Sequence, residues 1–362
     1  MLHAPRFSEL SVTMARQLGA EELAAALTFN STAASGSYLQ RPDWPQLCPP
    51  PARHRYLVVR AYRGEKLLGL GLARLTRLGP RSWLATLRRG PVTCNIADLA
   101  EVLPAMAQAL RSVGVCSLVI NPRWHDAQAS EAIAVLKQIG AQILPASDQS
   151  LHRATLVVDL PDGPNADKTL EASLKQRCRR QLRKAEAMGL TTRPVQSLEE
   201  AMLYEPILAD FHARRGLSRE NVPSVAAQWH MTRDRGVFLL GWLHGQPICG
   251  HTVIADGDRA FWLTMASLEG HTELPKNYLL IHKALQICQG QGFASYDMAG
   301  THSRFAGGVI DQSTENRDQF KTAFGPRHVE LVPAMVLPLR AAEHAILFNL
   351  RQKWRQWGKV KK

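Results

Sequence analysis

Two segments near the end of the chain decide the fold: Gly292-Phe-Ala-Ser-Tyr-Asp-Met-Ala-Gly300 and Gln319-Phe-Lys-Thr-Ala-Phe-Gly325. The first predicts a buried strand that ends in an acid, Asp297, followed by small residues. The second predicts a short helical turn that carries Lys321 and closes at Gly325. Ligands of open α/β sheets bind beside the carboxyl ends of strands, so Asp297 and Lys321 are candidates for a site. Spacing alone leaves a second interpretation open, an N-capping aspartate and a surface lysine.

The residues around Lys321 suggest a kind of chemistry. A lysine flanked by aromatic side chains is partly desolvated, so its charge acts strongly at short range. A reaction that develops negative charge on a carbonyl oxygen needs such a cation. We therefore expect Lys321, Phe320 and Asp297 at a reaction centre.

Composition limits the class of protein and its partners. The 362 residues suffice for two domains with separate cores, and the formal net charge is +13. This excess favours nucleic acid, phosphorylated substrates or an anionic membrane face as partners, with solubility alone as the other explanation. The sequence has no apolar run of membrane-spanning length and no signal-peptide pattern at its start. Its six cysteines form no CxxC and have no metal-ligand spacing. We expect a cytoplasmic protein with free thiols and no metal.

The chain repeats one order of elements. Hairpins are predicted around Gly64 and Gly245, and a second glycine follows each at the same spacing, because 245 − 64 and 250 − 69 both equal 181. A helix, a glycine and a buried strand come later in each half. We infer two copies of a mixed α/β domain, residues 1–163 and 164–338, followed by a basic tail at 339–362. Because only the second copy carries Asp297 and Lys321, we expect the first to be structural or to hold a substrate.

The second domain is predicted to begin with a basic helix over residues 168–188. Its apolar residues lie four apart and form one stripe: Leu170, Leu174, Cys178 and Leu182. Six cations lie within ten residues: Lys175, Arg177, Arg179, Arg180, Arg183 and Lys184. This density favours a surface that contacts a phosphate backbone, and a solvated helix face is the alternative. Further on, the patterns predict a helix at 199–215, a last strand at 329–337 and a basic amphipathic helix at 341–358 that could rest on an anionic membrane.

Several segments, in this order, resemble the FemABX family of aminoacyl-tRNA-dependent peptidyltransferases. The resemblance lies in Ser37-Tyr-Leu-Gln-Arg-Pro-Asp-Trp44, Gly90-Pro-Val92, Arg183–Gly189, Gly245–Gly250, Ala266-Ser267 with Asn277–Leu280, Tyr296–Gly300 and Phe320–Gly325. It implies two tandem acetyltransferase-like (GNAT-type) subdomains. It also implies transfer of an amino acid from aminoacyl-tRNA to an amine acceptor such as a nucleotide- or lipid-linked cell-wall precursor. This transfer needs no other cofactor, since the ester is already activated.

The resemblance assigns residues to roles. Phe320 and Lys321 lie at the reaction centre, with Lys321 supplying the cation, and Asp297 is a candidate proton acceptor. Substrate contacts are implied at Arg219, Trp262 and Tyr296. Contacts to tRNA are expected at Lys175, Arg179, Arg180, Arg183 and Lys184. One departure concerns the acceptor: Pro223 stands where family members that act on cell-wall precursors have a tyrosine, which puts a peptidoglycan precursor in doubt. Histidines such as His251 receive no role.

Two other functions remain open at this point. The first is an acyl-CoA-dependent N-acyltransferase of the related duplicated type. Such an enzyme should have a glycine-rich loop before the helix at 275–290, but Leu274-Pro-Lys-Asn-Tyr278 contains no glycine. The second is a non-enzymatic protein that binds RNA or a membrane, against which Lys321 and Asp297 argue. The sequence predicts a cytoplasmic location, with a peripheral contact at the inner membrane face.

Overall fold

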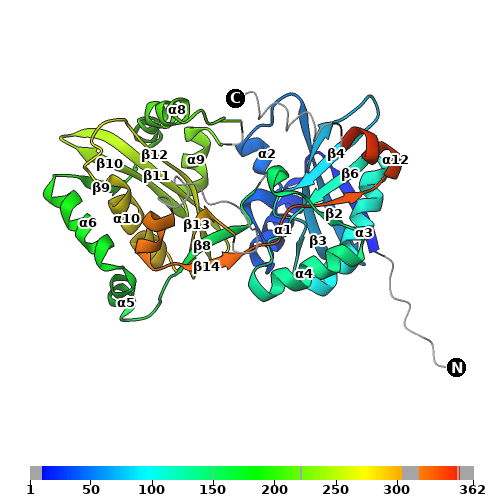
Figure 1. Cartoon of the computed structure of the whole chain (residues 1–362), viewed down its shortest axis with the longest axis horizontal. Coiled ribbons are helices and arrows are strands. Elements are labelled where there is room, and N and C mark those ends of the chain that lie inside the picture. Colours follow the sequence, from blue (N-terminus) through cyan, green and yellow to red (C-terminus); the bar gives the residue numbers. More distant parts are fainter. Residues whose placement is uncertain (1–9, 150, 221, 304–317, 349, 351–362) are drawn as a thin grey trace. The chain divides into compact units, whose positions relative to one another are not determined.

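The computed structural model describes all residues except 1–9, 150, 221, 304–317, 349 and 351–362. The chain divides into two compact units (Figure 1). Unit 1 contains residues 1–45, 50–153 and 330–362, and unit 2 contains residues 46–49 and 154–329. Each unit is built around a mixed sheet of its own.

Unit 1 has a sheet with the strand order β1-β2-β3-β4-β6-β15-β7, and β5 pairs with β3. Its strands are β1 (Leu10–Ala15), β2 (His54–Arg63), β3 (Lys66–Arg77), β4 (Trp83–Leu87), β5 (Val92–Thr93), β6 (Val115–Ile120), β7 (Gln142–Ile143) and β15 (Met335–Pro338). Its helices are α1 (Ala20–Thr32), η1 (Tyr38–Gln40), α3 (Ile96–Ser112), α4 (Asp126–Gln138), η2 (Ala146–Asp148), α12 (Ala341–Glu343) and η4 (His344–Phe348), while α2 (Trp44–Leu47) has residues in both units.

Unit 2 has a sheet with the strand order β14-β8-β13-β12-β11-β10-β9. Its strands are β8 (Ala154–Asp159), β9 (Thr191–Pro194), β10 (Gly236–Leu243), β11 (Gln246–Asp256), β12 (Arg259–Ser267), β13 (Ser295–Thr301) and β14 (Arg327–Glu330). Its helices are α5 (Ala166–Ser173), α6 (Gln176–Ala187), α7 (Leu198–Met202), α8 (Tyr204–Arg214), α9 (Val225–Thr232), α10 (Lys276–Gly290) and η3 (Thr322–Phe324). Figure 1 shows α6 and α10 over one face of this sheet and α8 and α9 over the other.

The two units repeat one arrangement, as the glycine spacing predicts. An antiparallel hairpin leads to a third strand, a long helix and then a parallel strand, as β2–β3–β4–α3–β6 in unit 1 and β10–β11–β12–α10–β13 in unit 2. The hairpins even have a register shift at equivalent places, between Ala61 and Tyr62 and between Gly241 and Trp242. These shifts are 180 residues apart (241 − 61), whereas the turn glycines are 181 apart (245 − 64). Gly64 is therefore three residues after Ala61, and Gly245 is four residues after Gly241, so the two glycines occupy neighbouring positions of their turns. The predicted mixed α/β duplication is confirmed.

The domain boundaries differ from those expected at 163 and 338. The strand β8, expected in the first domain, pairs with β13 in the sheet of unit 2. The single last strand expected at 329–337 is two strands in different sheets: β14 joins the sheet of unit 2, and β15 pairs with β6 in unit 1. Strands join a sheet through contacts distant in sequence, and a local pattern carries no information about these partners.

Two predicted helices are each divided in two. The helix expected at 168–188 stops after Ser173 and restarts at Gln176, because Leu174 is extended and the backbone N–H of Lys175 donates to Ala323 O at 2.9 Å. The helix expected at 199–215 becomes α7 and α8, and Pro206 lies in the first turn of α8, where its missing N–H is tolerated. Of the helix expected at 341–358, the structure describes α12 and η4, and residues 351–358 lie outside the described part.

Candidate active site

The candidate site lies where two parallel strands of unit 2 diverge. β12 and β13 pair over only three positions, Arg259 with Ser295 through Phe261 with Asp297. Beyond this point β12 remains paired with β11, and β13 remains paired with β8. In unit 1 the equivalent strands β4 and β6 stay paired as far as Leu87 and Ile120. In unit 2 the backbone groups beyond this point therefore need partners other than the neighbouring parallel strand.

Asp297 stabilises the backbone at this divergence. Its Oδ1 accepts a hydrogen bond from the Thr155 hydroxyl of β8 and another from the backbone N–H of Ala299 at 2.9 Å. Ala299 has a φ of 62°, which is uncommon for a residue other than glycine, and it lies within the register shift between Asp297 and Gly300. The carboxylate thus holds a strained bulge in the middle of β13, which continues to Thr301, beyond the strand end that the sequence predicted at Asp297. These contacts give Asp297 a structural task, and its service as a proton acceptor stays a prediction.

Lys321 places its ammonium group at the divergence. The residue is only 3% exposed, which excludes the surface lysine that spacing left open. Its Nζ donates to the backbone carbonyls of Ala299 at 3.1 Å and Gly300 at 2.8 Å. It also lies 5.3 Å from the centre of the Trp262 ring, within the range of a cation–π contact. A buried charge needs such compensation, because removal from water is costly. The result is a fixed positive charge at the carboxyl end of β13.

Trp262 reaches Lys321 because β12 has an irregular register. Thr252 pairs with Thr264 but the next residue of β11, Val253, pairs with Trp262, so Leu263 is an extra residue in β12. Such a bulge re-aims the side chains beside it. Trp262 is half-buried and lies against Lys321, and its expected contact with a substrate stays a prediction.

The turn that carries Lys321 is held by aromatic packing. Residues 318–321 are helical and continue into η3, which ends at Gly325 with a φ of 72°. Tyr278 from α10 packs edge-on against Phe320, with ring centres 4.8 Å apart, and stacks on Phe324 at 5.6 Å. A Cβ at Gly325 would lie 2.6 Å from the backbone oxygen of Ser173, so only glycine allows this close approach. The predicted closure of the turn at Gly325 is therefore confirmed.

Tyr296 lies in the core of unit 2, where a substrate cannot reach its side chain, contrary to the expectation. It is 0% exposed, and its hydroxyl lies 2.5 Å from His251 Nε2. His251 Nδ1 lies 2.8 Å from the carbonyl oxygen of Thr264, which can only accept, so Nδ1 carries the proton and Tyr296 donates to Nε2. Burial lowers the pKa of His251 to about 4 and raises that of Tyr296 well above its ordinary value. Both groups are therefore neutral near pH 7.

His251 also supports the candidate site, and sequence reasoning missed it. Its ring lies 5.1 Å from that of Trp262, on the strand beside it. The contacts run from Tyr296 through His251 to Trp262 and then to Lys321. The sequence of β11 contained a signal, because a histidine within a run of mostly apolar strand residues is expected to be buried and then needs a buried hydrogen-bond partner.

Arg219 is occupied by a carboxylate. Its Nη1 and Nη2 contact the two carboxylate oxygens of Glu205, the second at 3.1 Å. This hydrogen bonding raises the pKa of Arg219. A phosphate at the same edge of the guanidinium would have to displace Glu205. Pro223, the departure noted in the sequence, accepts a hydrogen bond at 2.9 Å from the buried amide of Gln228. Both features set this region apart from the phosphate-holding pair that the resemblance implies.

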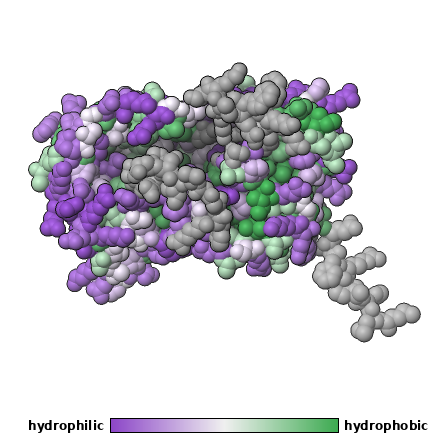
Figure 2. Space-filling model, in the orientation of Figure 1, coloured by the Kyte–Doolittle hydropathy of each residue, from purple (hydrophilic) through white to green (hydrophobic). Residues whose placement is uncertain are grey.

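The five cations expected to contact tRNA lie on one exposed segment. Lys175 precedes α6, and Arg179, Arg180, Arg183 and Lys184 lie along it, all exposed. The apolar stripe is confirmed, because Leu170, Leu174, Cys178 and Leu182 are buried in the core. Figure 2 shows hydrophilic residues gathered over α5 and α6. The structure thus presents a basic surface beside the turn that carries Lys321, to which α6 is joined by the bond from Lys175 N to Ala323 O.

Other groups that sequence analysis considered are accounted for. Within the described residues, the histidines, cysteines and acids form no cluster that could hold a metal ion. All six cysteines are free thiols, and Cys94 alone among them is exposed. No described helix has the length and apolar character needed to cross a bilayer.

Comparisons with known proteins agree with this geometry. Residues 172–306 match the model of the Acetyltransferase (GNAT) domain, a range that runs from α5 to β13. No curated protein matches the chain. The crystal structure of FemX has the same fold, with a TM-score of 0.73 and 14% identity over 92% of this chain and 99% of that one.

A second solved structure, L-PGS from Bacillus licheniformis, has a TM-score of 0.58 and 11% identity over 90% of this chain and 93% of that one. These likenesses confirm the tandem GNAT-like fold that the resemblance implies. The domain match places the likeness to GNAT acetyltransferases in unit 2.

Proposed function

We propose that the chain is an aminoacyltransferase, which moves an amino acid from aminoacyl-tRNA to an amine acceptor and so forms an amide bond. The observation that carries this proposal is the buried ammonium of Lys321 at the divergence of β12 and β13. Acyl transfer passes through a tetrahedral intermediate with a negatively charged oxygen. A fixed cation in a water-poor site stabilises such an oxygen far more than the same cation in water.

The reaction needs few groups from the protein. The acceptor amine attacks the ester carbonyl of the donor, a C–N bond forms, and the carbonyl electrons move to the oxygen beside Lys321. Collapse of the intermediate breaks the C–O bond to the ribose, whose oxygen leaves with a proton, while the amine loses one. Lys321 acts through its charge, which the carbonyls of Ala299 and Gly300 and the Trp262 ring hold in place. Asp297 is the proposed proton acceptor, with the structural contacts described above.

Charge supports RNA as the donor. The chain has a formal net charge of +13, and the exposed cations of α6 adjoin the turn of Lys321. Neither α6 nor α10 has an acidic residue in its first turn, so the positive ends of both helix dipoles are left uncompensated there. A polyanion gains from every such charge, and its binding weakens steeply as salt rises.

For the acceptor we propose only a chemical class, an amine on a cell-wall or lipid-linked precursor. FemX shares the fold, and the Arg219–Glu205 pair argues for an acceptor held differently from a nucleotide diphosphate at that residue. A peripheral contact with an anionic membrane would bring a lipid-linked acceptor to the protein and stays a proposal.

One observation favours a second candidate, an acyl-CoA-dependent N-acyltransferase. The domain that matches residues 172–306 is described as an acetyltransferase. The same cation at Lys321 would serve a thioester as well as an ester, so the site geometry is compatible with either donor.

Donor binding separates the two candidates. We would mix the purified protein with labelled bulk aminoacyl-tRNA or with acetyl-CoA at two salt concentrations. Salt-sensitive tRNA binding without CoA binding supports the aminoacyltransferase. Binding of acetyl-CoA without tRNA would replace it with the acyl-CoA enzyme, and the basic helix would then be a plain surface or a site for the phosphates of CoA.

A further inference from the structure

The cations of α6 lie on two different sides of the helix. Cys178, Leu182 and Ala185 form its buried face. Residues four apart share a side of a helix, so Arg179 and Arg183 lie together to one side of this face. Arg177 lies on the other side, and Arg180 lies between the two sets. The basic surface is therefore not uniform, and Arg177, one of the six cations counted in the sequence, is not among the five residues expected to contact tRNA.

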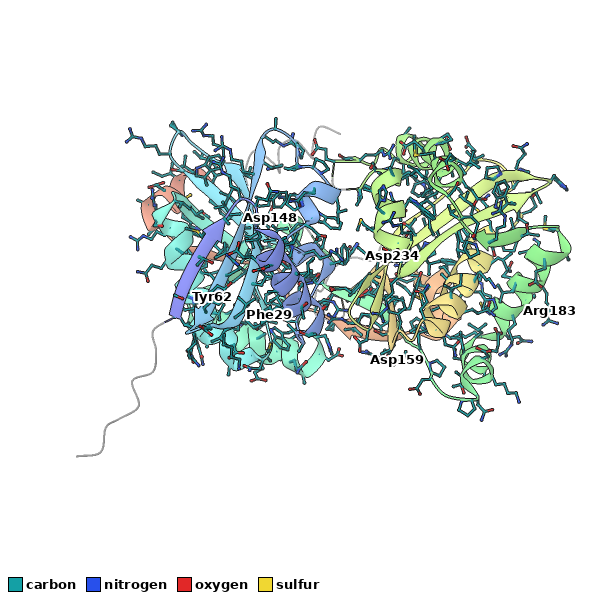
Figure 3. All side chains as sticks on the ribbon, turned by 180° about the vertical axis from the view of Figure 1, so that it is seen from behind. Phe29, Tyr62, Asp148, Asp159, Arg183 and Asp234 are labelled. Carbon is teal, nitrogen blue, oxygen red and sulfur yellow. The ribbon has the colours of Figure 1, made fainter. Side chains whose placement is uncertain are left out.

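Arg179 and Arg183 are oriented by backbone groups of their own region. Arg179 Nη1 donates to the carbonyl oxygen of Glu171 at 3.3 Å, and Arg183 Nε donates to that of Arg179 at 3.4 Å. Figure 3 labels Arg183 at the outer side of α6, where its side chain points away from the unit. These two arginines can attract a polyanion from a distance, but they lie on the other side of the buried face of α6 from Arg177.

Arg177 lies beside the aromatic cluster of the reaction centre. Arg177 is in the first turn of α6, two residues after Lys175, whose backbone N–H donates to Ala323 O at 2.9 Å in the turn that carries Lys321. In agreement with this position, the positive charges of Arg177 and Arg180 oppose the rise that burial causes in the pKa of the Tyr278 hydroxyl. Tyr278 packs against Phe320 at 4.8 Å, and Lys321 is the next residue. The first turn of α6, which carries Arg177, therefore adjoins the turn that carries Lys321.

The position of α6 relative to this turn is fixed by the backbone. The bond from Lys175 N to Ala323 O ties the start of the helix to η3. The close approach of Gly325 to the oxygen of Ser173 fixes the end of α5 against the same turn. A ligand that spans Arg177 and Lys321 therefore meets two cations held in a constant relation.

We propose that Arg177 and Arg180 bind the phosphodiester nearest to the esterified end of the donor RNA, while Arg179 and Arg183 only raise its local concentration. This inference rests on the proposed aminoacyl-tRNA donor. A guanidinium suits the task, because its planar N–H groups bind two phosphate oxygens at once. In aminoacyl-tRNA the last phosphodiester is one nucleoside from the ester, so a cation in the first turn of α6, beside the turn that carries Lys321, can hold it during attack.

The test compares two arginines of the same helix, both exposed, as Arg177→Gln and Arg183→Gln. Turnover is measured with full-length aminoacyl-tRNA and with a short RNA aminoacylated at its 3′ end, each at low and high salt. We expect Arg177→Gln to reduce kcat/KM by about ten- to a hundredfold with both donors, since a hydrogen-bonded charge is lost. Arg183→Gln should matter only with full-length tRNA and only at low salt. Arg177→Lys should recover part of the loss, because it keeps the charge without the two-pronged contact.

The outcomes separate this inference from the function on which it rests. Equal effects of the two Gln variants with the short donor would overturn the subsite while the wild-type protein still used RNA. A wild-type protein that uses acetyl-CoA and no RNA donor would overturn the proposed function and the subsite together. Thermal unfolding of each variant shows whether a loss of turnover comes from a loss of fold.

Discussion

Replacement of Lys321 by methionine removes the charge at the reaction centre and keeps most of the side-chain volume. The wild-type ammonium makes two hydrogen bonds to backbone carbonyls and one contact with the Trp262 ring. If the charge stabilises the oxyanion, its loss should reduce kcat by about 10²–10³-fold, as the removal of one oxyanion-hole donor does. Lys321→Ala should reduce turnover at least as much, with an added cavity in the core.

The effect on stability should be smaller than the effect on rate. Methionine leaves the carbonyls of Ala299 and Gly300 without their charged donor, which costs about 1–3 kcal/mol for each buried group. The loss is offset in part because a lysine no longer has to be desolvated. We therefore expect a modest fall in the urea midpoint and a protein that is still folded in the assay. Single-turnover transfer, measured beside urea unfolding, gives both quantities for one preparation.

Lys276 provides a matched control. It is also buried, 9% exposed, and its Nζ also donates to two backbone carbonyls, those of Gly270 at 2.9 Å and His271 at 3.2 Å. Lys276→Met should lower stability by a similar amount and leave kcat within a few-fold of the wild-type value. Wild-type turnover in Lys321→Met would remove this residue from the mechanism. An equal loss of turnover in Lys321→Met and Lys276→Met would mean that Lys321 acts through the stability of the fold, as Lys276 does, and not through its charge at the site.

Three further predictions concern the turn at Gly325, the buried His251 and the basic surface of α6. Gly325→Ala should lower the free energy of unfolding by about 1–3 kcal/mol, seen in urea, because the φ of 72° and the nearby oxygen of Ser173 both oppose a Cβ. The folded-state pKa of His251, about 4, lies below its ordinary value of 6.5, so the unfolded chain binds the proton first. Stability should then be highest above pH 6.5 and fall toward pH 4, and thermal unfolding of His251→Gln should lack this part of the pH dependence. Charge reversal on α6 should weaken tRNA binding and flatten its dependence on salt, and unchanged binding curves would return the helix to a solvated face. The reversed residues are Arg179, Arg180 and Arg183.

Local patterns were sufficient for the features that depend on neighbours in sequence. The glycines at 64, 245 and 325 have positive φ and mark two hairpins and the end of η3, and the stripe from Leu170 to Leu182 is buried. The same stripe also hid the break between α5 and α6. Leu174 keeps the four-residue spacing in an extended backbone, and the bond that stabilises the break comes from Ala323, about 150 residues away.

The parts that sequence could not supply depend on distant partners. β8 and β15 have ordinary strand patterns, and only their pairing with β13 and β6 shows the unit to which each belongs. Tyr296 is polar and adjacent to Asp297 in sequence, which made it a candidate site residue. Its side chain instead points into the core and contacts His251, which is 45 positions earlier. Arg219 was expected to bind phosphate, but its guanidinium forms an ion pair with Glu205. In each case the deciding contact joins elements that sequence analysis treats separately.

The comparison of the two units gives a physical reason why one copy of a repeated fold carries the proposed chemistry. In unit 1 the parallel strands β4 and β6 stay paired to their ends, and the Asn121 side chain then accepts the backbone N–H of Arg89 at 2.9 Å. In unit 2 the pairing stops at Asp297, and the carbonyls of Ala299 and Gly300 turn to Lys321 instead. A buried lysine is tolerated there because these acceptors need a donor, and the donor brings a charge into the fold. The shortened strand pairing therefore creates the electrostatic condition that the proposed acyl transfer requires, and the two requirements, satisfied carbonyls and a fixed cation, are met by one side chain.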